Sequence, residues 1–225
     1  MEMFAMKNIK IFAILCATAF LMQCRQITAS ILVDYYRLPQ AEREKVTQDQ
    51  AAWGKFKTRL IKAQSQAVQD AIGKLQLDGL SREERYAKLD AAVRKSRDPA
   101  HFNLEKDWHI VAYLLTGDAN LKEEHLSNAP LHNVIFGGLK TSVTTGYGPV
   151  RYFDAKLVAE TAAALAGADR KLIAARYDPA AMKKLDIYAP PEADEKKAIL
   201  QVIEELTAFF QKAAATHEDV ITFVW

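Results

Sequence analysis

The stretch Asn103–Gly117, NLEKDWHIVAYLLTG, carries the apolar pattern around which the rest of the chain can be arranged. Four apolar side chains recur at spacings of four, three and four residues, which places them on one face of an α-helix. These residues are Leu104, Trp108, Val111 and Leu115. Ile110 and Leu114 widen the face, so we expect a helix that is buried on much of its circumference. Asn103 is the predicted N-cap and Gly117 the predicted C-cap of this helix.

A second stretch, Gly146–Phe153 (GYGPVRYF), predicts a β-strand that follows a turn. Lys140–Gly148 is rich in Thr and Gly and predicts a loop or hairpin, whereas Pro149–Phe153 alternates as a strand does. The preceding pair Gly137-Gly138 can end a helix and let another backbone approach closely. Residues 220–225 predict a terminal strand, which we expect to pair with Pro149–Phe153.

Helical patterns dominate the remaining sequence. Residues 41–77 have apolar side chains at helical spacing, and Ser81–Glu84 forms a capping box that starts a further helix. This elaboration, at about residues 41–98, is either a solvated helical layer or a partner-binding helical surface. Residues 192–215 predict a long amphipathic helix. The predicted fold class is therefore α+β, mostly helical with a small β-sheet.

The composition predicts one globular domain of balanced charge. The chain has 225 residues, half of them hydrophobic, which is enough for a sizeable core. Thirty Lys and Arg oppose 28 Asp and Glu, and these charges are interspersed. The overall balance therefore gives no electrostatic reason to expect nucleic acid as a partner.

The N-terminus predicts export. Lys7 and Lys10 precede the apolar run Ile11–Met22, which is short for a bilayer span and typical of a secretory signal. Residues 1–23 are thus the predicted signal, and residues 24–225 a single domain. A buried N-terminal helix or strand is the alternative. We expect an exported protein that is periplasmic or membrane-anchored.

The cleavage site has two alternatives. Cys24 follows Leu21-Met22-Gln23, which resembles a bacterial lipoprotein box, so Cys24 is the lipidation candidate. Ala29 or Ser30 could instead serve a conventional signal peptidase. Residues 25–28 read as a short strand and residues 29–38 as an amphipathic helix, and cleavage after Ala29 would remove this element. This favours the retention of Cys24, with the membrane contacted only through the N-terminal signal or the lipid anchor.

Five motifs in order resemble the YfbM-like family, a bacterial family of unknown function. They are KDWHIVAYLLTG, APLHNVIFGG, GYGPVRYF, ARYDPAAM and DIY. The resemblance covers residues 103–225 well and residues 24–38 weakly, and it implies no activity. The chain departs from the family where Ala189 separates Tyr188 from Pro190, and where a tryptophan often found just after this step is absent.

The candidate binding residues are polar or aromatic and lie near glycine-flanked turns. They are Lys106, Asp107, Trp108, His109, Thr116, Tyr147, Arg151, Tyr177 and Asp178. Trp, Tyr and Arg often anchor binding surfaces. Arg151 beside Asp107 or Asp178 would equally make a structural ion pair, and Ala substitution of Arg151 would separate the two roles.

Chemistry-bearing motifs give little support for an enzyme. The five histidines show no HExxH spacing, and the sequence contains no GxSxG and no phosphate-binding loop. We therefore assign no catalytic residue, no metal site and no cofactor. His109 beside Asp107 could act as a general base, but a histidine that is hydrogen-bonded at a helix edge is the preferred interpretation.

Three functions follow, in order of preference. The first is a non-catalytic protein-binding domain of the cell envelope, resembling an immunity or inhibitor protein, with a protein partner there. The second is an enzyme of unrecognised type with a small polar cleft around Asp107, His109 and Arg151. The third is a structural lipoprotein.

Overall fold

The computed structural model describes residues 31–120 and 130–224. The chain separates into two units, Met1–Ile31 and Leu32–Trp225, and the second unit is described below. The predicted signal, the lipidation candidate Cys24 and the predicted strand at residues 25–28 lie outside the described residues. Within the part that the structure describes, no helix is long and apolar enough to cross a membrane.

The described residues form a five-stranded antiparallel sheet in the order β2-β1-β5-β4-β3. The strands are β1 (Val33–Leu38), β2 (His101–Asn103), β3 (Leu139–Thr145), β4 (Gly148–Phe153) and β5 (Asp219–Val224). The predicted pairing of the C-terminal strand with residues 149–153 is confirmed, because Arg151 lies opposite Thr222 and Phe153 opposite Val220. The α+β fold class is confirmed as well.

The predicted helix at residues 29–38 is wrong, because β1 occupies residues 33–38. All six residues of β1 are buried, since the strand lies inside the sheet and both of its faces are covered. A strand covered on both faces loses the alternation of apolar and polar residues that identifies a strand in sequence. The spacing of Ile31, Leu32, Tyr35 and Leu38 happened to fit a helix.

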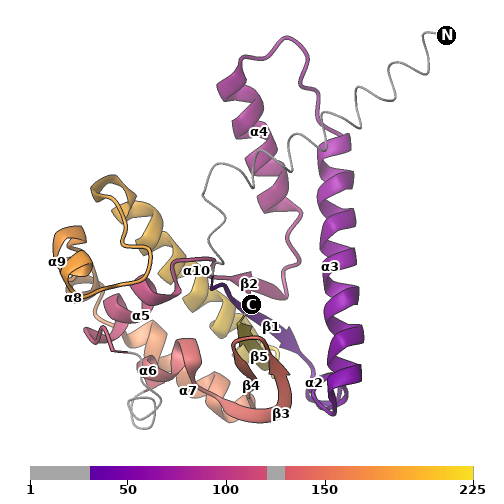
Figure 1. Ribbon diagram of the computed structural model, residues 1–225, viewed down its shortest axis with the longest axis vertical. Helices are drawn as coiled ribbons and strands as arrows, with labels where there is room; N and C mark the ends of the chain where they lie inside the picture. Colours follow the sequence, from indigo (N-terminus) through magenta and orange to yellow (C-terminus); the bar gives the residue numbers. More distant parts are fainter. Residues whose placement is uncertain (1–30, 121–129, 225) are drawn as a thin grey trace. The chain divides into compact units, whose positions relative to one another are not determined.

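Helices cover both faces of the sheet (Figure 1). Before β2 the chain forms α2 (Gln40–Val46), α3 (Gln50–Gly73) and α4 (Arg82–Lys95). After β2 it forms α5 (Trp108–Thr116), α6 (Pro130–Phe136), α7 (Ala155–Gly167), α8 (Arg170–Ala175), α9 (Pro179–Lys184) and α10 (Lys196–Ala215). A 3-10 turn, Ala193–Glu195, leads into α10.

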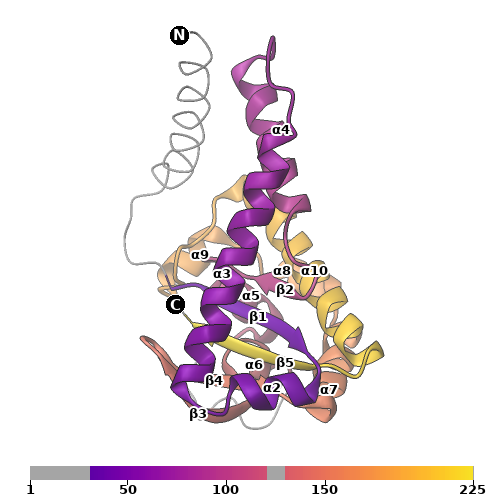
Figure 2. The ribbon, with the colours of Figure 1, turned by 90° about the vertical axis from the view of Figure 1, so that its right-hand side faces the viewer.

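The first half of α3 packs on one face of the sheet (Figure 2). Trp53 and Phe56 supply its buried side chains, and Trp53 lies edge-on to Phe223 with ring centroids 4.9 Å apart. Tyr36, Leu38, Val143, Val150 and Ile221 complete this core.

Helix α10 packs on the opposite face through an aromatic cluster. Phe210 is fully buried and contacts Tyr35, Phe153 and Phe209, with ring centroids 5.5 to 5.9 Å apart. The predicted long amphipathic helix is confirmed, because one face of α10 is buried from Ile199 to Ala213. Bulky apolar contacts of this kind hold the long helix against the sheet.

Of the loop or hairpin predicted at residues 140–148, the hairpin is present, as β3 and β4, and Gly138 shows why a glycine precedes it. Gly138 has a φ of 83°, and a Cβ there would lie 2.7 Å from the carbonyl oxygen of Tyr152. The close approach of another backbone, expected from the sequence, is therefore present. Arg151 lies in β4 opposite Lys140 of β3.

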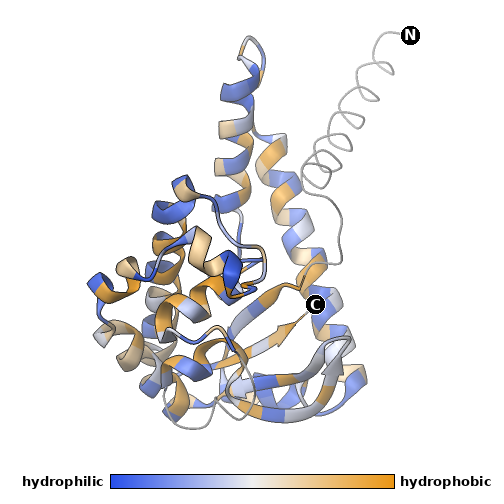
Figure 3. Ribbon diagram, turned by 60° about the vertical axis from the view of Figure 1, so that its left-hand side comes forward, coloured by the Kyte–Doolittle hydropathy of each residue, from blue (hydrophilic) through white to orange (hydrophobic). Residues whose placement is uncertain are grey.

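The remainder of α3 and all of α4 form a helical hairpin, which we call the arm and define as residues 57–97. Phe56 is the last buried residue before Leu104, so no residue between them is buried. The capping box that starts α4 is confirmed, since Ser81 and Glu84 exchange backbone-to-side-chain hydrogen bonds. Figure 3 shows hydrophilic and hydrophobic residues mixed along the two arm helices.

Candidate functional site

The segment before α5 forms a turn, not the start of the helix. Strand β2 ends at Asn103, whose side-chain oxygen accepts a hydrogen bond from the backbone N–H of Glu105. Glu105 has a φ of 50°, and the helix begins only at Trp108, with Asp107 at the N-cap. The predicted N-cap at Asn103 is thus wrong, because the side chain of Asn103 stabilises a local turn that delays the helix. The predicted C-cap is confirmed, since Gly117 is left-handed.

Trp108 and His109 join Tyr188 in a stack of rings. The ring centroids of Trp108 lie 5.0 Å from His109 and 5.6 Å from Tyr188, with nearly parallel planes. The backbone N–H of Tyr188 donates to Nδ1 of His109 at 2.9 Å. Nε2 of His109 lies 2.9 Å from the carbonyl oxygen of Ala119, so it is the protonated nitrogen that donates to this oxygen. Both ring nitrogens of His109 therefore hold two loops against α5.

Tyr177 lies beside the start of α5 and is buried. Its hydroxyl donates to the carbonyl oxygen of Glu192 at 2.7 Å. Burial raises the pKa of Tyr177 to about 12, and the carboxylates of Glu195, Asp194, Asp107 and Glu192 add to this rise. The next residue, Asp178, caps α9 by accepting hydrogen bonds from Ala180 and Ala181.

The other predicted site residues lie elsewhere or serve local structure. Thr116 is in the last turn of α5, where its hydroxyl donates to the carbonyl oxygen of Ala112 at 2.8 Å. Tyr147 is exposed in the turn between β3 and β4. Arg151 is half-buried in β4, and its Nη1 lies 3.4 Å from the carbonyl oxygen of Gly138. Lys106 is half-buried in the turn before α5.

The structure thus gathers part of the predicted set around the start of α5. Trp108 and His109 meet Tyr188, and Asp107 lies near enough to Tyr177 to affect its titration. Most of these groups are committed to hydrogen bonds that shape the loops. Among residues 31–120 and 130–224, no group of three or more His, Cys, Asp or Glu side chains is placed to hold a metal ion.

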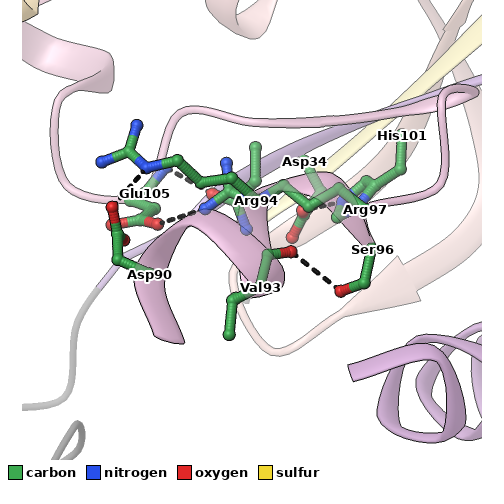
Figure 4. Close-up of polar contacts among 9 residues, drawn as sticks. Asp34, Asp90, Val93, Arg94, Ser96, Arg97, His101 and Glu105 are labelled. Atoms are coloured by element: carbon green, nitrogen blue, oxygen red, sulfur yellow. Dashed lines mark hydrogen bonds and ion pairs between the residues drawn. The ribbon is translucent and has the colours of Figure 1, made fainter. Parts of the chain in front are cut away.

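A polar cluster that we did not predict lies where the arm rejoins the sheet (Figure 4). His101 of β2 lies 2.5 Å from a carboxylate oxygen of Asp34 in β1, and Asp34 is buried. His101 also stacks on Tyr36, whose hydroxyl donates to Asp98 at 2.6 Å. Burial and this hydrogen bond raise the pKa of Tyr36. The cluster was missed because β1 was predicted to be a helix.

The arm, like the cluster around His101, contains none of the predicted site residues. Residues 57–97 contain ten Lys and Arg against five Asp and Glu, a net charge of +5 in a chain whose total is +2. Ile61 and Tyr86 are exposed on the arm, at 53% and 56%. The signal was available in the sequence, because a count of charges by segment, instead of over the whole chain, shows this segregation.

Both edges of the sheet are protected. Strand β2 has only three residues, and β3 has an irregular register between Lys140 and Thr144. The side-chain amide of Gln50 accepts from the N–H of Thr144 at 3.1 Å and donates to its carbonyl oxygen at 3.0 Å. Gln50 therefore takes the two hydrogen bonds that a further strand would make. Short, irregular and covered edges discourage the addition of another chain.

The fold and this site define an α+β domain with helices on both faces of an antiparallel sheet and a basic helical arm. Residues 30–223 match the model of the family described as Domain of unknown function (DUF1877), and the chain belongs to that family. A search of curated proteins found no match.

Among solved structures, the chain resembles a protein of unknown function, YfbM from Escherichia coli. The TM-score is 0.52 at 12% sequence identity, over 86% of this chain and 99% of that chain. At this identity the likeness shows the fold alone. It agrees with the resemblance to the YfbM-like family that the five motifs indicated.

Proposed function

We propose that this protein is a non-catalytic protein-binding domain of the cell envelope, resembling an immunity or inhibitor protein. The observation that carries the proposal is the arm, residues 57–97, which contains no buried residue yet forms two helices. Such a long exposed element contributes little to the core. Its surface, with Ile61 and Tyr86 among basic side chains, has the residue types that anchor protein interfaces.

The geometry around α5 gives the enzyme alternative less support. His109, the candidate base, uses both ring nitrogens in internal hydrogen bonds. The hydroxyl of Tyr177 and the carboxylate of Asp178 are likewise bound to backbone groups. A general base needs a nitrogen within reach of the substrate proton. These residues support the loops next to α5.

The envelope part of the proposal comes from the N-terminal sequence. Residues 1–23 have the basic start and apolar run of a secretory signal, and Cys24 follows it. The test is the intact mass of the mature chain isolated from a membrane fraction. A lipid-modified N-terminus at Cys24 would support the anchor, whereas a free N-terminus at Ile31 without acyl mass would exclude it.

Binding is tested by crosslinked co-purification of the full-length protein, tagged at its C-terminus, from its own envelope. One dominant stoichiometric partner is the expected result. An unrelated exported protein with the same tag is the control, and a partner must be absent from that sample. No partner above the control would contradict the protein-binding function and favour a ligand screen by thermal shift.

A further inference from the structure

If the protein binds another protein, as proposed above, its exposed surfaces decide where that partner docks and what chemistry the partner has. Three surfaces are exposed enough to consider: the edge of β3, the edge of β2 and the arm. The first is closed by Gln50 at Thr144, and the second is only three residues long. The arm has no such cover, since all its residues are half-buried or exposed.

The charge of the arm sets it apart from the rest of the chain. With +5 on residues 57–97 and +2 in total, the remaining residues carry a net charge of −3. Lys62, Lys74 and Lys95 are exposed on the two arm helices or at their ends. Fields of one sign steer partners of the opposite sign and raise association rates.

The base of the arm is fixed to the sheet by three sets of contacts. Asp98 accepts a hydrogen bond from Tyr36 of β1, and Arg97 pairs with Glu105 at 3.3 Å. Leu60 and Ala100 pack on the core that contains Phe56. A surface held in place loses less conformational freedom when it binds.

The composition of the arm distinguishes between classes of partner. Helix α4 is rich in charged residues, its Leu89 and Val93 are half-buried, and Tyr86 is its one exposed large apolar side chain, so it lacks the broad exposed apolar face with which a helix lies in a membrane surface. Acidic residues such as Glu83, Glu84 and Asp90 interrupt the basic ones, which would place negative charge against nucleic-acid phosphates. Mixed charges with exposed Tyr86 and Ile61 suit a protein surface instead.

We propose that the arm docks onto an acidic protein surface, with Ile61 and Tyr86 as apolar contacts and the arm lysines as the complementary charges. The predicted interface is basic on this side and acidic on the partner. Binding should weaken with salt, because exposed charges are screened over about 8 Å at physiological ionic strength.

The experiment places a photo-crosslinking residue at four exposed apolar positions in the full-length protein in its own cells. Two positions lie on the arm, Ile61→p-benzoylphenylalanine and Tyr86→p-benzoylphenylalanine. Two matched controls lie outside the arm, at Leu172 and Leu185, which are also exposed. The inference expects one acidic protein to be captured from the arm positions and not from the controls.

The dissociation constant is then measured between the purified partner and the purified protein. The variant Lys62→Glu, Lys74→Glu and Lys95→Glu should bind at least about tenfold more weakly at about 50 mM salt, and within about threefold of wild type at about 500 mM. The control variant Lys156→Glu, Lys171→Glu and Lys197→Glu changes three exposed lysines outside the arm. It should bind as wild type does. Thermal unfolding shows that both variants are folded.

The possible failures are distinguishable. A partner captured from Leu172 or Leu185, with an affinity that the arm variant does not change, would overturn the arm as the docking site and leave the proposed function standing. Capture from none of the four positions, with no partner in the co-purification, would overturn both. Arm-dependent binding of a DNA duplex or of phosphatidylglycerol vesicles, without capture of a protein, would overturn the acidic-protein partner.

Discussion

Helices α10 and α4 show two ways in which one chain stabilises a helix. Helix α10 buries seven residues, among them Phe209 and Phe210, against the sheet and the helices α5 and α7. Helix α4 buries none and instead has a capping box at Ser81 and an ion pair between Arg94 and Asp90. Tertiary packing normally supplies most of the stability of a helix. The comparison teaches that the sheet and α10 make up the stable part of the molecule, whereas the arm is held by local interactions.

The largest expected effect is in the aromatic cluster under α10. Phe210→Ala removes a fully buried ring that contacts Tyr35 and Phe153. Loss of the buried area and the resulting cavity should lower the free energy of unfolding by about 3–5 kcal/mol, measured by urea denaturation. Tyr86→Ala on the arm is the matched change, and it should cost less than about 0.5 kcal/mol. Similar losses for both would contradict the division between core and arm.

Gly138→Ala should have the second-largest effect on the free energy of unfolding, because the substitution is unfavourable for two independent reasons. The residue has positive φ, and the added Cβ would lie 2.7 Å from a carbonyl oxygen of β4. We expect a loss of about 2 kcal/mol or more in urea denaturation. Gly54→Ala is the control, since a Cβ in that part of α3 meets nothing within 4 Å. It should stabilise the protein by about 0.5–1 kcal/mol, because alanine favours the helix.

The elements that the sequence predicted best are those with local signals. The capping box at Ser81 and the left-handed cap at Gly117 were both predicted and are present. The close backbone approach at Gly138 was also predicted. Both caps depend on neighbours in sequence, so the residue type itself carries the information.

The elements that the sequence predicted poorly depend on distant neighbours. Strand β1 was predicted to be a helix, because its burial on both faces is a property of the sheet and not of the segment. The pairing of His101 with Asp34 joins residues 67 positions apart. Of the candidate site, Trp108, His109, Asp107 and Tyr177 did come together, but their roles in fixing the loops depend on Tyr188 and Glu192, which contribute backbone groups. A hydrogen bond to a backbone group cannot be predicted from residue type, because nearly every residue has the same backbone groups.

Tyr177→Phe should have a moderate effect that depends on pH. It removes the hydrogen bond to Glu192 and should cost about 1 kcal/mol at neutral pH. The pKa of Tyr177 is raised from 10.0 to about 12 in the folded protein. The folded state therefore retains the proton longer than the unfolded state, so this contribution is full below pH 10 and is lost as the pH rises towards 12.

Urea denaturation from neutral pH to about pH 11 measures this dependence. The wild type should lose stability more steeply than Tyr177→Phe above pH 10, the ordinary pKa of tyrosine. Tyr35 and Tyr36, whose pKa values are also raised, keep their contributions in both proteins. Equal slopes for the two proteins would show that Tyr177 titrates in the folded state as it does in the unfolded chain.

The smallest expected change in the free energy of global unfolding comes from a helix cap in the arm. It gives the sharpest test of the difference between the arm and the core. Ser81→Ala and Asp154→Ala each remove a helix N-cap, one at α4 in the arm and one at α7 beside the sheet. Each cap contributes about 1 kcal/mol to its helix. Since α7 buries Val158 and Leu165, Asp154→Ala should lower the free energy of global unfolding by the full amount.

Ser81→Ala should leave global unfolding within about 0.3 kcal/mol of wild type and speed amide hydrogen exchange within α4 about fivefold. This difference follows because α4 can unfold without exposing buried side chains of the core. If Ser81→Ala lowered global stability as much as Asp154→Ala, the arm and the core would unfold as one unit. The arm would then be part of the cooperative structure, and charge reversals on it would also cost stability.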